Sequence, residues 1–267
     1  MSKIMINPNF IEMDIRENIS YEVFMREYAV PGKPVLLKGM TKDWNATNLW
    51  DESYFYDKFG HLKVTVRNIQ DVEKQMLLSE YLDYMFITTE RLPYYLRDVI
   101  IDNDFQVLAT HYTTPSFFRC LTKRLPSHLR PVWRWLFFGA RNTNSNLHVD
   151  ILGTHAWNAV IRGKKKWHFY PPKDSPKILC SPKKKEPSIM ADIKCASKPT
   201  ICIQEEGDIV FTPSNWVHSV INLEPCIAIT ENYIDLSNIK EVNESLVKGK
   251  MFEQINFFRQ FIPELTS

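Results

Sequence analysis

Residues 145–170 read SNLHVDILGTHAWNAVIRGKKKWHFY, and residues 200–234 read TICIQEEGDIVFTPSNWVHSVINLEPCIAITENYI. Both stretches are rich in Val, Ile, Thr, Trp and Tyr and contain turn residues at short intervals, which is typical of short β-strands. Around them the same pattern begins at Trp133 and predicts strands over 133–139, 146–150, 155–162, 166–170, 200–204, 208–212, 216–223 and 226–234. Many short strands at close spacing predict a mainly β fold, either a sandwich or a barrel.

The composition is that of an ordinary folded protein. The 267 residues are 44% hydrophobic and 24% charged, which excludes a disordered, collagen-like or coiled-coil chain. No run approaches the roughly 18 apolar residues of a membrane span, so we expect no membrane partner. Charged residues interrupt the first 19 positions, which argues against a secretory signal.

The five cysteines form no C-x-x-C pair and are odd in number. This usage favours a reducing, intracellular location, nuclear or cytoplasmic. A zinc site formed by Cys180, Cys195, Cys202 and a nearby histidine is an alternative, but it would lack the usual C-x-x-C knuckle.

Helices are expected outside the strand-rich region. Ser20 can cap a helix over residues 20–28, and a second helix is expected over 77–85. We therefore predict three parts, namely an N-terminal region (1–130) that buttresses the barrel, the β core (131–235) and C-terminal helices (236–267).

The C-terminal segment 236–265 has apolar residues at helical spacing, among them Met251, Ile255, Phe258 and Phe261. An apolar stripe of this size left in water would exceed what monomers tolerate. We expect it to pack outside the barrel or against a second copy of the chain in a homodimer.

The sequence His148-Val149-Asp150 lies on a predicted strand, where residues two apart point to the same face. Chance alone gives roughly 0.4 such H-x-D matches in this composition, so the motif needs a second signal. It comes 68 residues later at His218, on another predicted strand. Two histidines and one carboxylate form the facial triad of non-haem Fe(II) oxygenases, which leaves coordination positions open.

A third signal follows directly in Trp157-Asn158 and in Gly163-Lys164-Lys165-Lys166-Trp167. Together the motifs run in the order H-x-D, W-N, G-x-K-x-W, G-D, P-x-x-W-x-H and T-x-N between Ser145 and Tyr233. In this order the sequence resembles the JmjC family of 2-oxoglutarate-dependent oxygenases, and most of all its lysyl-hydroxylating members. The resemblance implies a double-stranded β-helix of the jelly-roll or cupin type, with Fe(II) as cofactor and 2-oxoglutarate and O2 as co-substrates.

The resemblance also implies roles for individual residues. Iron would be held by His148, Asp150 and His218, and the distal carboxylate of 2-oxoglutarate by Lys165. Lys165 points opposite to Lys164 and Lys166 on a strand, so it alone enters the barrel if those two face solvent. Further residues match positions that contact the co-substrate or lie close to iron, namely Ser145, which replaces an expected threonine, and Tyr95, Asn158, Thr230 and Asn232.

Three functions remain open at this point. The first is a dioxygenase that hydroxylates a protein side chain, lysyl by analogy, and the second is an N-methyl lysine or arginine demethylase that uses the same chemistry. The third is a cupin-type binding module that has lost catalysis, against which the intact triad and Lys165 argue.

Residues 162–185 hold nine Lys or Arg against the single acid Asp174. A basic stretch near the barrel mouth would attract acidic or nucleic-acid-associated protein substrates. Such a run of lysines is also common in loops that are simply solvated.

Overall fold

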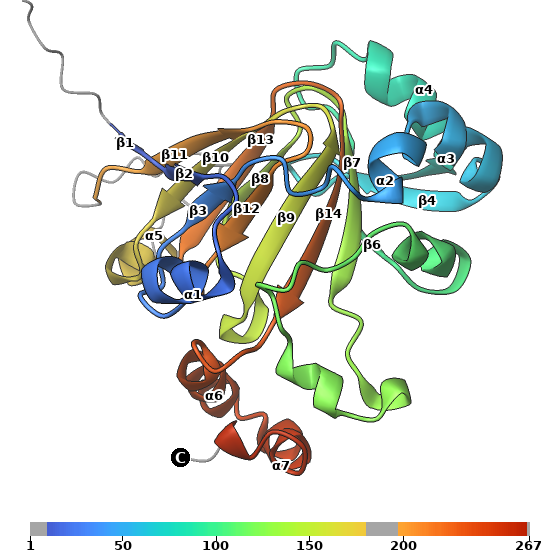
Figure 1. The fold of residues 1–267 in the computed structure, drawn as a ribbon. Coiled ribbons are helices and arrows are strands. Elements are labelled where there is room, and N and C mark those ends of the chain that lie inside the picture. Colours follow the sequence, from blue (N-terminus) through green and yellow to red (C-terminus); the bar gives the residue numbers. More distant parts are fainter. Residues whose placement is uncertain (1–9, 180–196, 266–267) are drawn as a thin grey trace, which may run out of the picture.

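The computed structural model describes residues 10–179 and 197–265. Its centre is a barrel of eight consecutive strands that are divided between two sheets, four in each (Figure 1). One sheet has the order β11-β10-β13-β8 and the other β12-β9-β14-β7, all antiparallel. The strands are β7 (Arg134–Gly139), β8 (Asn144–His148), β9 (His155–Arg162), β10 (Lys165–Tyr170), β11 (Thr200–Gln204), β12 (Ile209–Thr212), β13 (Val217–Asn222) and β14 (Cys226–Tyr233). This arrangement confirms the predicted double-stranded β-helix.

Strands from the N-terminal region extend both sheets. β1 (Ile11–Glu12) pairs in parallel with β11, while β2 (Asp14–Arg16) and β3 (Val35–Leu37) continue the other sheet beyond β12. At the opposite edge of that sheet, β7 is followed by β6 (Tyr95–Ile100), β4 (Lys63–Arg67) and β5 (Glu73–Leu77). The larger sheet therefore has nine strands in the described residues, and a pocket inside the barrel can receive side chains from β6 as well.

Short helices cover the outer side of this larger sheet. α3 and α4 lie beside β4, and α1 lies near β3 (Figure 1). Ser20 caps α1 by accepting a hydrogen bond from the backbone N–H of Val23, as its position before the helix predicts. The helices on this side are α1 (Tyr21–Phe24), continued by a π-helical turn (Met25–Ala29), α2 (Asn45–Leu49), α3 (Glu52–Phe59) and α4 (Leu78–Ile87). α5 (Ser175–Leu179) packs instead on the smaller sheet, where Ile178 clusters with Tyr170 and Val217.

The largest hydrophobic cluster joins these helices to the barrel. Trp157 on β9 is fully buried and stacks on Phe118, with ring centroids 5.8 Å apart. Phe24 of α1 contacts Phe118 and also Phe211 of β12, at 5.6 and 5.1 Å between centroids. β9 is therefore buried on its outer as well as its inner face, from His155 to Ile161.

The C-terminal segment folds into α6 (Ile239–Lys248), α7 (Phe252–Arg259) and a 3-10 turn (Pro263–Leu265), at one end of the barrel (Figure 1). Its apolar residues pack on Leu125 and Ile234 of the same chain. Ile255 and Phe258 are buried as expected, whereas Met251 and Phe261 are only half-buried. The chain itself thus covers much of the stripe.

None of the helices in residues 10–179 and 197–265 has the length and apolar character needed to cross a bilayer.

Candidate active site

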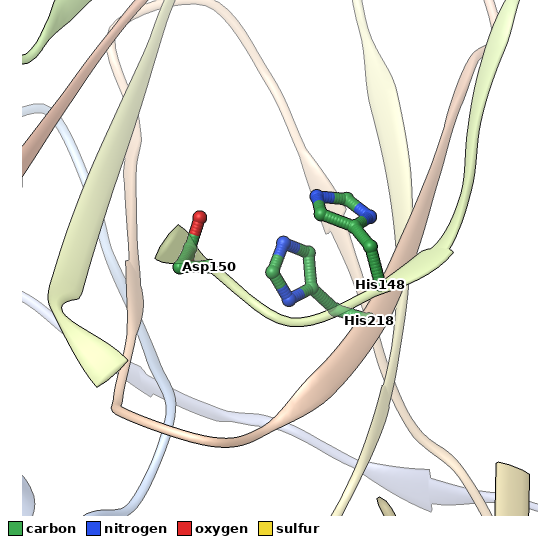
Figure 2. A group of neighbouring side chains, drawn as sticks. All are labelled: His148, Asp150 and His218. Carbon is green, nitrogen blue, oxygen red and sulfur yellow. The ribbon is translucent and has the colours of Figure 1, made fainter. Parts of the chain in front are cut away.

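His148, Asp150 and His218 come together at one end of the barrel (Figure 2). One potential ligand atom from each lies within 4.8 Å of the other two, and the imidazole centroids are 4.2 Å apart. The pairing of β8 with β13 places His148 directly opposite His218. Residues 70 positions apart are thus fixed as neighbours by strand register.

The sequence-based reason for pairing His148 with Asp150 is wrong in one respect. β8 ends at His148, so Asp150 is not on the strand and the same-face rule does not apply to it. Asp150 instead precedes a 3-10 turn (Ile151–Gly153) in which Leu152 and Gly153 adopt positive φ angles of 53° and 65°. Asp150 itself keeps an extended backbone, with φ −64° and ψ 157°, and the chain turns only after it.

Both histidines are oriented in the same way by their own strands. Nδ1 of His148 lies 2.6 Å from the carbonyl oxygen of Asn146, and Nδ1 of His218 lies 3.1 Å from that of Trp216. A carbonyl can only accept, so Nδ1 donates in each ring and Nε2 is the nitrogen that is not used by this contact. Metal-binding histidines are commonly oriented in this manner.

Asp150, the third residue of the triad, contributes an oxygen atom that can act as a ligand. Oδ2 of Asp150 is buried and has no hydrogen-bond partner among the described residues. Burial raises the pKa of this carboxyl, and the charge of His148 and the Asn232 side chain only partly oppose the rise. Burial likewise holds the pKa of His218 well below its usual range, which keeps the ring neutral. A neutral imidazole and a carboxylate oxygen without a donor suit a divalent cation.

The triad opens into a cavity of about 300 Å³. Eight of the nine predicted site residues line it, namely Ser145, His148, Asp150, Asn158, Lys165, His218, Thr230 and Asn232. The ninth, Tyr95, lies just behind, with its hydroxyl 3.4 Å from Nζ of Lys165. The structure therefore gathers the whole predicted set around one space.

A β-bulge makes this gathering possible on β8. Ser145 pairs with Val220 and His148 with His218, so three steps along β8 correspond to two along β13. In a regular strand, residues three apart face opposite sides of the sheet. The extra residue lets both Ser145 and His148 face the cavity.

Lys165 is buried, with 2% of its surface exposed, whereas Lys164 and Lys166 are half-buried, as alternation predicts. Its ammonium donates to Oδ1 of Asn222 at 2.7 Å, and Nδ2 of Asn222 donates to Oγ1 of Thr143 at 2.7 Å. In the part of the chain that the structure describes, no carboxylate pairs with this ammonium. A buried cation with neutral partners only is costly, and an anionic ligand would compensate it.

Sequence reasoning missed Asn222, although a signal was present. Asn222 lies four residues after His218 on β13, so the pleat directs both side chains into the barrel. Gly139 also contributes, because a Cβ there would lie 1.9 Å from Nδ2 of Asn222. Only glycine leaves room for the amide that orients Lys165.

Other predicted residues are held by short side-chain contacts. Nδ2 of Asn158 donates to Oγ1 of Thr230 at 2.6 Å, and Oδ1 of Asn158 is buried with no hydrogen-bond partner in the described part of the chain. Nδ2 of Asn232 donates to Oγ1 of Thr154 at 2.8 Å. The first bond connects β9 and β14, and the second ties β14 to the residue that precedes β9.

His155 and Ser214 brace the turns next to Asp150 and His218. The backbone N–H of Ser214 donates to Nδ1 of His155 at 2.9 Å, and its hydroxyl donates to the carbonyl of Gly153 at 2.6 Å. Gly153 belongs to the turn after Asp150, and Ser214 to the turn before His218. One buried side chain therefore ties both turns together.

Some residues of the alternative zinc site and of the basic stretch lie outside the described residues, namely Cys180, Cys195 and Lys183 to Lys185. Cys202 is described and is a buried free thiol. Within the described part, Lys164 is neutralised by Glu205 at 3.1 Å and Glu224 at 3.9 Å.

Comparison with known proteins agrees with this geometry. Residues 20–238 match the cupin-like domain family. The chain belongs to this family. Over 251 residues it is 34% identical to "Arginine-specific demethylase JMJ22" of Arabidopsis thaliana, with 89% of this chain and 49% of the relative covered.

Two further cupin-like relatives support the resemblance to JmjC oxygenases. The chain is 30% identical to "Bifunctional arginine demethylase and lysyl-hydroxylase psr-1" of Caenorhabditis elegans, over 87% of this chain and 63% of the relative. It is 28% identical to "2-oxoglutarate and iron-dependent oxygenase JMJD4" of Gallus gallus, over 85% and 61%. The chain thus spans about half to two thirds of the length of these relatives.

Proposed function

We propose that this protein is an Fe(II)- and 2-oxoglutarate-dependent dioxygenase that hydroxylates a protein side chain. The observation that carries the proposal is the pairing of two sites in one cavity. At one end are two imidazoles and a carboxylate, and deeper inside is the buried ammonium of Lys165, which has no carboxylate partner among the described residues. A metal chelator that carries a distal carboxylate satisfies both ends, and 2-oxoglutarate is such a molecule.

In this proposal each residue has a defined task. His148, Asp150 and His218 would hold Fe(II), which supplies oxidative chemistry with O2 and 2-oxoglutarate when bound. Lys165 binds the distal carboxylate, and Asn222 holds the ammonium in place for it. Ser145, Asn158, Thr230 and Asn232 offer hydroxyl and amide groups along the cavity wall, and Tyr95 adds a hydroxyl beside Lys165.

The fold supports this use of the residues. Residues 131–235 act as the catalytic core, residues 1–130 buttress it, and the segment after 235 closes one end. Trp135, Phe137 and Trp167 line the cavity with apolar surface, which limits the water that reaches the reacting groups.

The experiment measures succinate formed from 2-oxoglutarate by the purified chain with Fe(II), without any added peptide. We expect turnover that is lost in His148→Ala and retained in Lys166→Ala, a matched change on the outer face of β10. A wild-type chain that binds Fe(II) yet forms no succinate would contradict the proposal and favour a binding module.

Demethylation of N-methyl lysine or arginine is the second candidate, because two relatives carry demethylase in their names. Mass spectrometry of a modified substrate separates the two reactions. Hydroxylation adds one oxygen atom, whereas demethylation removes one methylene unit from the peptide.

The nature of the partners extends the proposal. We infer a protein substrate, acidic or nucleic-acid-associated because of the basic stretch 162–185, and an intracellular location in the nucleus or cytoplasm.

A homodimer through the C-terminal helices would use the side chains that remain exposed there, Val247 and Phe252, and light scattering tests it.

A further inference from the structure

The cavity has one wall that no sequence motif predicted. On β6, Leu96 pairs with Phe138 and Val99 with Leu136, so Arg97 and Asp98 together oppose the single residue Phe137. This is a β-bulge, and its effect is to turn side chains away from their regular alternation. Arg97 and Asp98 are adjacent, yet both line the cavity.

The backbone at the bulge is strained. Asp98 has a φ of +62°, a left-handed conformation that is uncommon for residues other than glycine, although Asp and Asn tolerate it best. Strain of this kind tends to persist at functional sites, where the surrounding structure enforces it. Here it places a carboxylate at the mouth of the cavity, where 61% of the side chain is exposed.

The positive charge of Arg97, which also lines the cavity, compensates the Asp98 carboxylate only in part. Arg97 donates to Oδ1 of Asp71 at 3.1 Å, outside the cavity lining, and its Nε is 3.8 Å from Asp98. Among the described residues that line the cavity, only Asp98 and Asp150 are acidic, and Asp150 belongs to the triad. Asp98 is therefore the acidic group at the mouth that the proposed iron and co-substrate do not use.

The surface beside Asp98 is apolar. Trp135 and Phe137 on β7 line the same cavity and are half-buried, and Ile151 is 47% exposed at the rim. An apolar channel that ends near a carboxylate suits a side chain with an aliphatic stem and a cationic head, because such stems pack on apolar surface while the head stays solvated or paired. Aromatic rings also attract cations.

We propose that Asp98 is a specificity-determining residue that recognises the positive charge of a lysyl or arginyl side chain entering the cavity. This inference rests on the proposed function, since it concerns the substrate of the same site. The Asp98 carboxylate selects a basic substrate side chain over a neutral one of similar length.

The test uses four pools of capped heptapeptides with randomised flanks and Lys, Arg, Gln or Glu at the centre. The full chain is immobilised with Mn(II) and 2-oxoglutarate, and the retained peptides are quantified by mass spectrometry. We expect the wild type to retain the Lys or Arg pool about five- to tenfold more than the Gln pool, a value between those of exposed and desolvated charge pairs. Asp98→Asn should bring this ratio close to one, and Asp98→Lys should favour the Glu pool.

Asn suits a positive φ, so Asp98→Asn should fold normally. Asp71→Asn is the matched control, because it removes the same charge from a carboxylate that also contacts Arg97 but lies outside the cavity lining. Its pool ratio should equal that of the wild type. A wild type without charge preference, or equal effects of the two variants, would overturn the role of Asp98.

Succinate formation is measured on the same samples after Fe(II) replaces Mn(II). Charge preference without succinate formation would refute the proposed oxygenase function and leave the role of Asp98 intact. Succinate formation without charge preference would refute the role of Asp98 alone.

Discussion

Replacing Lys165 by methionine should separate stability from co-substrate binding. The substitution removes a buried ammonium, whose desolvation costs several kcal/mol, and it keeps the volume of the side chain. Against this gain, Oδ1 of Asn222 loses its donor, which costs about 1–3 kcal/mol. The two effects oppose each other, so we expect the free energy of unfolding without ligand to change by less than about 2 kcal/mol.

Binding of 2-oxoglutarate should respond far more strongly. A ligand present at a hundred times its Kd stabilises a protein by about 2.7 kcal/mol, or roughly 5–10 °C in Tm for a domain of this size. Losing a charged hydrogen bond worth about 1.5–3 kcal/mol weakens affinity roughly 10- to 100-fold. At the same ligand concentration the stabilisation then falls to about 0.4–1.4 kcal/mol, half of the wild-type shift or less.

The assay is thermal unfolding with Mn(II), with and without 2-oxoglutarate, and Mn(II) affinity is measured in parallel. Lys164→Met is the matched control, because this lysine points to the outer face and pairs with Glu205 and Glu224. It should keep the full ligand response. A Lys165→Met protein that keeps the response, or that loses more than about 3 kcal/mol of stability without ligand, would refute the assignment and indicate a structural cation.

Three other perturbations test the surroundings of the site. Gly139→Ala should destabilise the fold and weaken 2-oxoglutarate binding together, since its Cβ would collide with Asn222; calorimetry with and without ligand measures both. Burial lowers the pKa of His155 from 6.5 to about 3. Between these two pH values the unfolded chain therefore binds a proton at His155 that the folded chain does not bind. Stability should therefore fall as pH drops from about 6.5 toward 3, with a flatter slope in His155→Gln, measured by urea unfolding. Leu246→Ala on α6 should cost about 2–5 kcal/mol because Leu246 is fully buried, whereas Val247→Ala, half exposed beside it, should cost little in the same assay.

The strands could be predicted from the sequence because each contains β-branched and aromatic residues between turn residues. The expected ranges 155–162 and 200–204 match β9 and β11 in full, and the other barrel strands differ by one or two residues at either end. The residues of the candidate site could also be predicted, because H-x-D, G-x-K-x-W and the later histidine are short motifs with a definite order. Such local signals do not depend on which strand lies next to which.

What could not be predicted depends on the pairing partner of each strand. The bulge on β8 that directs Ser145 and His148 to one side exists only relative to β13, and the bulge at Asp98 only relative to β7. Neither leaves a mark in the local sequence. Asn222 escaped notice for a related reason, because its importance comes from Lys165 on the neighbouring strand rather than from its own motif.

The unfavourable features of this fold converge on one cavity. Among residues 10–179 and 197–265, no carboxylate pairs with the buried cation of Lys165 and no donor reaches the buried Oδ2 of Asp150, while Asp98 has a strained backbone. Along the proposed co-substrate path, the charges of Asp150 and Lys165 cancel. A divalent cation alone would leave an excess of two positive charges there, and a dicarboxylate alone an excess of two negative charges. Each ligand should therefore bind more tightly in the presence of the other. Losing Asp150 should weaken 2-oxoglutarate binding because it removes a ligand of the metal, even though Asp150 does not contact the distal carboxylate.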